Sequence, residues 1–553
     1  HFKLRPLKEL YFFGETAKAS YGLHGNFQTI IILIIIGISL LALSGTNYVN
    51  LTTAGSTTRF KEVAVKRLTG SSVGMLRVQL MGESVIISLI SLGIGLTLVQ
   101  LLLPKFGALT GVNVSLMRLN DSMLWLKIIG GGIVIGVLSG VYPAFFLTAI
   151  QPLLLIKERI KGTRSLFRSA LMTFQFTLSV VMIVAIIVIH RQLTFVRSMD
   201  LGFDKEQVLM IHTPADIPNE FVLRQQFESR LENIPGVEGV SFSIGSLGIF
   251  LSESADMVIN GEVRSGSKML GVDEKYFDVM GLEVLEGRSF SLDSPGDSAL
   301  LMTPSGARIG GILFNETAMK EYGASVGQRV YVPDGSDSAK QEPRKYFEIV
   351  GVVRDFHFQS LHEKIEPLSF IWFHKPGITA SIRVSPSNIH ATVGAIEAEY
   401  KNVWQAGSDY SFLDDTFNKF YARDQQLASV IDCFAVLAVI IASLGLFALS
   451  SFMVSGRMKE IGVRKVLGAS VGRIYSMLSW DFLRWIVVAV LIGCPIGWYT
   501  MNAWLRTFEY RISIGMDVFA IAALLAVGIA LLTITWQSIN VAKANPVESL
   551  RYE

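Results

Sequence analysis

Long apolar runs separated by short charged loops dominate this sequence of 553 residues. A helix needs about 20 consecutive apolar residues to cross hydrocarbon about 30 Å thick. Runs of this kind lie at 28–51, 80–103, 124–148, 169–190, 429–453, 483–505 and 516–537. The pattern predicts an α-helical polytopic membrane protein in which seven spans are present.

The polar stretch 191–427 has a different pattern, because short apolar runs alternate there with turns rich in Gly, Pro, Asn and Asp. It predicts a mixed α/β extracytoplasmic domain with two lobes, each having a sheet and a helix. The predicted strands are 207–213, 237–244, 282–285, 312–314, 328–332, 347–353, 368–373 and 380–384. The predicted helices are 219–233, 316–322 and 388–400.

A charged segment between apolar runs occurs twice, at 59–72 and, 398 residues later, at 457–470. The two copies align without a gap, and they indicate a duplicated membrane unit. The identical pairs are Arg59/Arg457, Lys61/Lys459, Glu62/Glu460, Val65/Val463, Gly70/Gly468 and Ser72/Ser470. Conservative pairs, such as Lys66/Arg464 and Arg67/Lys465, fill much of the remainder.

Each copy predicts a short helix, a sharp corner and a second helix that runs into the membrane. In the second copy Val463 and Leu467 fall on one helical stripe, surrounded by basic residues. Gly468 suits the left-handed position that ends a helix, and Ser470 suits the N-cap of the next. A basic anchor on lipid headgroups is one interpretation. A docking helix for a soluble partner explains the repeated order of residues better, since an anchor needs only charge.

Charge is divided sharply along the chain. Residues 191–427 carry 22 Lys and Arg against 33 Asp and Glu, a net charge of −11, which leaves +14 for the rest. The basic short loops are 52–79, 150–168 and 455–475, so the positive-inside rule places these loops in the cytoplasm and 191–427 outside. The overall charge of +3 gives no indication of nucleic-acid binding. The two cysteines, Cys433 and Cys494, lie in apolar spans and predict neither a disulfide framework nor a metal site.

The predicted organisation is two membrane units around one outer domain. Residues 1–26 read as the tail of a first periplasmic domain whose remainder, with one span, we expect to precede this sequence. Residues 27–157 form a first three-span unit, 165–190 a transmembrane helix, 191–427 the outer domain and 428–553 a second three-span unit.

Several motifs together resemble the FtsX-like permeases, specifically the macrolide-exporter type of ABC transporter permease in its duplicated eight-span form. The motifs are the basic turn 459–469, Tyr276-Phe277, Glu286-Gly287-Arg288, Asn315-Glu316, the run 349–357 and the closing segment 544–550. The first copy of the basic turn departs from the family pattern at Ala64 and Thr69. The resemblance covers nearly the whole chain and implies a bacterial inner-membrane location and a separate cytoplasmic ABC ATPase dimer as partner.

The resemblance also implies which residues contact that ATPase. They are Arg59, Lys61, Glu62, Lys66, Arg67, Gly70, Arg457, Lys459, Glu460, Arg464, Lys465 and Gly468. The sequence lacks the Gly-x4-Gly-Lys-Ser/Thr pattern of a nucleotide site, so we expect no cofactor in this chain, with ATP and Mg bound by the ATPase. Glu83 and Asp481 align across the repeat and either cap the coupling corner or are solvated at headgroup level.

No catalytic residues and no metal site are predicted. Asp355, His357, His362 and Glu363 could imitate a metal cluster, but we interpret them as a surface patch after a strand. The predicted function is ATPase-driven export or extraction of an antimicrobial peptide, a macrolide-like compound or a lipoprotein, with a periplasmic adaptor or outer-membrane channel as a further partner. The alternatives are an FtsX-type signal transmitter that controls a cell-wall hydrolase or peptide sensing, and a polytopic membrane enzyme with a periplasmic active site.

Overall fold

The computed structural model describes most of the chain and divides it into two compact units. The described residues are 27–54, 56–110, 121–148, 163–214, 219–247, 250–251, 253–298, 308–331, 345–372, 378–455, 460–461, 463–464, 467 and 469–543. The membrane unit comprises the described residues up to Gln192, those of Asp424–Leu505 and those from Ile512 onward. The outer unit comprises Leu193–Arg423 and, from a distant part of the sequence, Arg506–Arg511.

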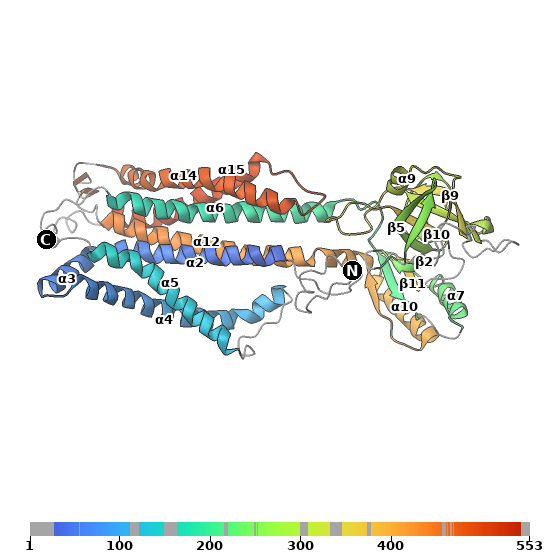
Figure 1. Cartoon of the computed structure of the whole chain (residues 1–553), viewed down its shortest axis with the longest axis horizontal. Coiled ribbons are helices and arrows are strands. Elements are labelled where there is room, and N and C mark those ends of the chain that lie inside the picture. Colours follow the sequence, from blue (N-terminus) through green and yellow to red (C-terminus); the bar gives the residue numbers. More distant parts are fainter. Residues whose placement is uncertain are drawn as a thin grey trace. The chain divides into compact units, whose positions relative to one another are not determined.

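The membrane unit consists of helices (Figure 1). They are α2 (Phe27–Ala54), α3 (Ser56–Leu68), α4 (Val73–Thr110), α5 (Ser122–Thr148), α6 (Thr163–Ser198), α12 (Ala422–Ser455), α14 (Val471–Leu505) and α15 (Met516–Lys543). All of these except α3 are long and apolar enough to cross a membrane, which makes seven among the described residues. The predicted seven spans are therefore confirmed.

Several of these helices are longer than the apolar runs that predicted them. Helix α4 has 38 residues and α6 has 36, whereas about 20 residues cross the hydrocarbon. Helix α6 continues past the apolar run that ends before His190, through Arg191 to Ser198. An apolar-run criterion stops at the first charged residues, so it finds the span but misses the polar end of the helix.

Small residues allow α4 and α5 to approach closely. A Cβ added at Gly136 would lie 2.8 Å from the Cα of Val85, and one added at Gly140 would lie 2.8 Å from the Cβ of Ser84. Ser88 Oγ donates a hydrogen bond of 2.8 Å to the carbonyl of Gly132, which belongs to the same face. The glycines of α5 therefore form a close-packing face of the kind found between membrane helices.

The outer unit is built on strands that pair into one sheet. The strands are β1 (Val208–His212), β2 (Val237–Ser246), β3 (Phe250–Leu251), β4 (Glu253–Ile259), β5 (Glu262–Val272), β6 (Val284–Gly287), β7 (Arg308–Asn315), β8 (Arg329–Tyr331), β9 (Lys345–Val353), β10 (Leu368–Trp372), β11 (Thr379–Val384) and β12 (Tyr410–Phe412). Ten of them follow the order β10-β7-β9-β8-β4-β5-β2-β11-β1-β12, while β3 pairs with β2 and β6 pairs with β9. Since β10 also pairs with β5, the first six of these strands close on themselves.

In the described part of the outer unit the α-helices are α7 (Glu220–Leu231), α8 (Tyr276–Met280), α9 (Glu316–Tyr322), α10 (Ile389–Trp404) and α11 (Leu413–Phe420). One apolar core lies between α7, α10 and strands β1, β2 and β11, around Phe227 and Phe242. A second core joins α9 to strands of the closed set, around Phe314 and Ile349. The prediction of two lobes is right for the cores and wrong for the sheet, because β5 pairs with both β10 and β2 and makes the strands continuous.

The hairpin β4–β5 was missed by the strand prediction. Its turn has Asn260 at φ 53° and Gly261 at φ 80°, which is the pattern of a two-residue turn that needs positive φ at both positions. The flanking strands pair from Ile259↔Glu262 onward. The Asn-Gly pair is a strong hairpin signal, but polar residues at 253–256 and 262–268 weaken the apolar alternation around it.

Two glycines of the outer unit provide a test of its packing. Gly287 and Gly261 have nearly the same positive φ, 77° and 80°, but a Cβ at Gly287 would lie 2.2 Å from the carbonyl O of Val350, whereas one at Gly261 would meet nothing within 4 Å. Both Gly→Ala changes carry the cost of a left-handed residue, and only Gly287→Ala adds overpacking of about 1–3 kcal/mol. We expect calorimetry of the purified chain to show a clearly lower Tm for Gly287→Ala. Equal Tm values would contradict this account.

Candidate functional site

The first elbow, which we define as residues 59–75, has the geometry of a helix, a corner and a second helix. Helix α3 ends at Leu68, and Gly70 follows with φ 102°. The N–H of Ser71 donates to the carbonyl of Lys66 at 2.9 Å, which closes the end of the helix. Ser72 Oγ accepts a hydrogen bond of 3.3 Å from the N–H of Met75 and caps the start of α4.

The second elbow, residues 457–473, repeats these bonds where it is described. The N–H of Ala469 donates to the carbonyl of Arg464 at 2.9 Å, as Ser71 does to Lys66. Ser470 Oγ accepts from the N–H of Arg473 at 3.3 Å. The predicted N-cap role of Ser470 is therefore confirmed, and the duplication extends from the sequence to the hydrogen bonds of the corner.

Side-chain pairs are repeated as well. Glu62 bonds Lys66 at 2.9 Å, and Glu460 bonds Arg464 at 2.7 Å, each pair one helical turn apart. The same basic residue then reaches the next helix: Lys66 Nζ donates to Gln79 Oε1 at 3.4 Å, and Arg464 contacts the sulfur of Met477. Gln79 and Met477 are related by the same offset of 398 residues. One cation in each elbow thus connects its short helix to the span that follows.

The first elbow has a further connection to α4. Arg59 forms an ion pair of 3.0 Å with Glu83, and Glu83 accepts a hydrogen bond of 3.2 Å from Gln79. Glu83 therefore contacts α3 through Arg59, near the start of that helix and away from the corner at Gly70. The hydrogen bond and charge of Lys66 hold the pKa of Glu62 below its usual range, so this carboxylate stays ionised as a partner.

The predicted coupling residues differ in how far the structure describes them. Side chains are described for Arg59, Glu62, Lys66, Arg67, Glu460 and Arg464, together with the backbone of Gly70. For Lys61 the structure describes only its place in α3. Arg457, Lys459, Lys465 and Gly468 lie outside the described residues.

Apolar side chains are exposed beside these charges. Val65 and its counterpart Val463 are 59% and 49% exposed, and Leu68 and Leu467, at the ends of the two short helices, are 76% and 79% exposed. Exposed leucines rimmed by Lys and Arg form a surface that a partner or lipid can cover. Each elbow therefore presents the same combination of apolar contact and basic rim.

A second candidate region lies in the outer unit, on a segment that follows β9. We call residues 354–363 the strap. The N–H of His357 donates to the carbonyl of Leu201 at 2.8 Å, in the segment that follows α6. The N–H of Leu361 donates to the hydroxyl oxygen of Tyr421, next to the start of α12, at 2.9 Å. The strap is thus bonded to the chain just after one membrane helix and just before another.

The strap also holds the linker 506–511, which joins α14 to α15. His362 stacks on Phe508 with ring centroids 4.0 Å apart, and its Nδ1 donates to the carbonyl of Thr507 at 3.1 Å. His357 meets Tyr510 edge-on at 4.6 Å. Three chain segments that continue into membrane helices therefore converge on ten residues of the outer unit.

These contacts correct the interpretation of this segment as a surface patch. His357 is only 9% exposed, and burial lowers its pKa, although the charges of Asp355 and Asp200 oppose the shift. Asp355 accepts hydrogen bonds from the N–H and the hydroxyl of Thr317 at 3.0 and 2.7 Å. Among the described residues no group of three or more His, Cys, Asp or Glu could hold a metal ion. The segment is a packed junction.

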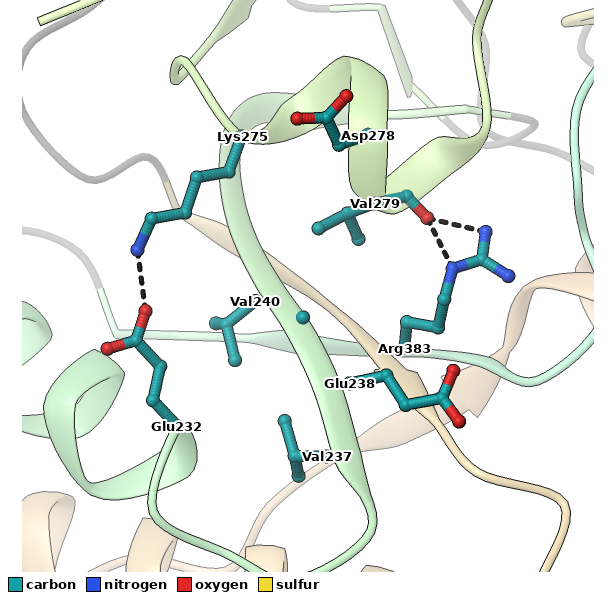
Figure 2. A pocket seen from close by; sticks show the side chains of 9 residues that line it. Glu232, Val237, Glu238, Val240, Lys275, Asp278, Val279 and Arg383 are labelled. Atoms are coloured by element: carbon teal, nitrogen blue, oxygen red, sulfur yellow. Dashed lines mark hydrogen bonds and ion pairs between the residues drawn. The ribbon is translucent and has the colours of Figure 1, made fainter.

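The outer unit also has a pocket of about 370 Å³ between the end of α7, the start of β2, α8 and β11 (Figure 2). Its two basic groups already have partners. Lys275 bonds Glu228 and Glu232 at 2.9 and 2.6 Å, and Arg383 donates to the carbonyl of Val279 at 2.9 Å. Figure 2 shows the carboxylates of Glu238 and Asp278 on opposite sides of the pocket, neither bonded to another of the residues drawn. The pocket therefore offers carboxylates rather than a free cation.

Sequence reasoning missed the linker 506–511 and the partners Gln79 and Met477. The linker carries Phe508 and Tyr510 among charged residues, and aromatic residues in a short polar loop are a signal that it packs against something. Gln79 and Met477 gave no signal in the sequence. They occupy equivalent positions in the two repeats, but one is polar and the other apolar, so a comparison of the repeats does not single them out.

Buried His357 predicts that the junction weakens in acid. Its pKa in the folded protein lies below the ordinary 6.5, so as pH falls below about 6.5 the unfolded chain binds the proton first and stability is lost, by at most about 1.4 kcal/mol per pH unit. We expect the Tm of the wild-type chain to fall more steeply between pH 7.5 and 5.5 than that of His357→Gln. His390→Gln, which changes an exposed histidine on α10, should keep the wild-type slope. An unchanged slope in His357→Gln would contradict the prediction.

Two family models match the chain. The model described as FtsX-like permease C-terminal matches residues 31–152 and again 433–546, and the model described as MacB-like periplasmic core domain matches residues 169–397. The first therefore falls on both repeats of the membrane unit and the second on the strand-rich part of the chain.

Two curated proteins and one solved structure illustrate what the chain is similar to. The chain is 21% identical over 357 residues to the ABC transporter permease YknZ of Bacillus subtilis, a match that covers 61% of this chain and 82% of YknZ. It is 23% identical over 256 residues to the macrolide export ATP-binding/permease protein MacB of Mannheimia succiniciproducens, covering 44% of this chain and 36% of that protein. The periplasmic region of MacB from Actinobacillus actinomycetemcomitans matches with 14% identity and a TM-score of 0.28, over 40% of this chain and 94% of that structure.

The duplicated elbows, the seven candidate spans and the outer α/β unit thus coincide with the parts that the family models describe. The chain belongs to the MacB/FtsX family of ABC transporter permeases.

Proposed function

We propose that this chain transmits motion driven by a cytoplasmic ABC ATPase dimer to its outer unit, from a place in the bacterial inner membrane. The observation that carries the proposal is the repetition of the elbow in sequence, backbone bonds and ion pairs. Two matching elbows suit two matching ATPase subunits. Hydrolysis of ATP then belongs to the partner, since the printed sequence has no Walker pattern.

The geometry of the elbows favours docking over a lipid anchor. An anchor needs cations near the headgroups and tolerates any order among them. In both elbows a basic residue is instead held by the acidic residue one turn earlier and reaches the helix that follows. A push on the short helix is therefore passed directly to α4 or α14, which is what a coupling element requires.

The strap is where such motion would enter the outer unit. It is bonded to the segment after α6, to Tyr421 before α12 and to the linker between α14 and α15. Movement of any of these helices would pull on residues 354–363 and, through them, on β9. The outer unit would then remodel or expel a bound substrate.

The substrate in this proposal is an antimicrobial peptide, a macrolide-like compound or a lipoprotein, passed to a periplasmic adaptor or outer-membrane channel. The pocket that exposes Glu238 and Asp278 favours a cationic substrate, because its two basic groups are already paired. A signal transmitter of the FtsX type would use the same lever. Co-purification of a channel or adaptor supports export, whereas co-purification of a cell-wall hydrolase or sensor kinase supports signalling.

Charge reversal in one elbow tests the docking role. We expect Arg464→Glu with Lys465→Glu to reduce the ABC ATPase that co-purifies with the tagged chain more than tenfold, because a reversed charge at an interface costs several kcal/mol. Membrane insertion of the variant should persist.

The matched control is Lys401→Glu with Lys419→Glu, which makes the same change of charge at two exposed lysines of the outer unit. It should leave ATPase association unchanged. Equal recovery of the ATPase with the elbow variant and the control, quantified by mass spectrometry, would remove the docking role.

A further inference from the structure

The two repeats meet inside the membrane unit through a polar contact between α2 and α12. Asn47 Nδ2 on α2 donates a hydrogen bond of 2.5 Å to the carbonyl of Ile441 on α12. Gln175 on α6 donates from its Nε2 to the carbonyl of Ala442 at 2.8 Å. Two side-chain amides therefore bond adjacent carbonyls on one face of α12, among apolar spans where polar groups need internal partners.

Gly445 makes this contact possible. A Cβ added at Gly445 would lie 1.9 Å from Asn47 Oδ1, 2.8 Å from Asn47 Cγ and 2.8 Å from Gln175 Nε2. Residues at this position with any side chain would collide with both amides. Asn47 is thus a knob on the first repeat, and Gly445 is the notch on the second that receives it.

The knob and the notch occupy equivalent positions in the two repeats. The offset of 398 residues that relates Arg59 to Arg457 also relates Asn47 to Gly445. A position that contacts its own equivalent lies at the axis of a two-fold arrangement, as in a symmetric dimer. The contact of Asn47 with Gly445 is the kind expected at a local two-fold axis between α2 and α12.

Because the contact is asymmetric, it selects the partner of each repeat. Two first repeats would bring Asn47 against Asn47, so that two knobs compete for one place. Two second repeats would bring Gly445 against Gly445 and leave two notches unfilled. Only a first repeat against a second repeat gives one knob in one notch.

We infer that the two repeats of one chain pair with each other through Asn47 and Gly445, so that a single chain forms the complete permease core and does not pair with a second copy across this face. If the proposed function is added, one chain presents both elbows to one ATPase dimer; this step alone rests on the proposed function. The pairing itself is independent of any ATPase and can be tested without one.

Disulfide formation tests the pairing. The variant Asn47→Cys/Gly445→Cys, in a Cys433→Ser/Cys494→Ser background, replaces two residues in direct contact, since a Cβ at position 445 would lie 2.8 Å from Asn47 Cγ. A disulfide joins Cβ atoms about 3.5–4.5 Å apart. On mild oxidation in native membranes we expect a cross-link within one chain, seen on a non-reducing gel as a shifted band of single-chain mass. A protease site introduced between residues 149 and 162 should then leave the two halves joined until reductant is added.

The matched control is Asn47→Cys/Leu444→Cys in the same background, since Leu444 is the neighbour of Gly445 and is 61% exposed. It should form no cross-link within the chain. A band of two-chain mass from the Asn47/Gly445 pair would show pairing between copies and overturn the inference. The absence of any cross-link from that pair would overturn it as well.

An exchange of the two residues provides a second test that a folding defect cannot imitate. Gly445→Asn puts two knobs at the axis, and we expect a lower Tm for the purified chain. The exchange Asn47→Gly/Gly445→Asn moves the knob to the other repeat and should regain more than half of that loss. If the double variant were as unstable as Gly445→Asn or less stable, the local two-fold contact would be refuted. Neither the cross-linking result nor the Tm of the exchange variant depends on whether the elbow variants lose the ATPase. The docking proposal and the pairing proposal can therefore be refuted independently of each other.

Discussion

In each elbow of this permease, one basic residue contacts both the short helix and the span that follows, and the rest of the membrane part depends on this interaction. Lys66 and Arg464 each hold an acidic residue on the short elbow helix and a residue on the next span. A glycine corner alone would be a hinge, since its left-handed residue leaves the two helices free to swing. The cation braces that hinge. In the proposed mechanism, movement imposed on an elbow is carried into α4 or α14 instead of being lost at the corner.

In the proposed mechanism the other ends of the spans must also be held, and the strap contacts the chain segments that follow α6 and α14 and precede α12. Its contacts are of two kinds: main-chain bonds to Leu201 and Tyr421, and aromatic stacking of His362 on Phe508. Burial of His357 lowers the pKa of its imidazole, so the packing of this junction favours the neutral ring. These contacts bring the chain next to three membrane helices together on ten residues that continue directly from β9.

The parts of this structure that the sequence predicted are those decided by local pattern. Seven spans follow from the length of apolar runs, and the caps at Gly70 and Ser470 follow from residue types with one strong conformational use. The hairpin at Asn260-Gly261 was also within reach, because its turn signal is explicit. The junction of His362 with Phe508 was not, since the two residues are 146 positions apart and nothing local couples them. Contacts of that kind are fixed by packing of the whole unit.

Duplication within one chain changes what an axis contact can be. In a dimer of identical chains, the residue on the two-fold axis meets a copy of itself, so a knob cannot be matched by a notch. Fusion of two repeats lifts that constraint, because the equivalent positions can diverge. Here one became Asn47, whose amide bonds a carbonyl of α12, and the other is Gly445, which leaves room for it. The same freedom explains why the elbows keep their ion pairs yet differ at Ala64 and Gly462: each needs to fit only its own neighbour. The asymmetry at the axis is thus a physical consequence of the fusion, and it is available only to a permease whose two halves are not copies.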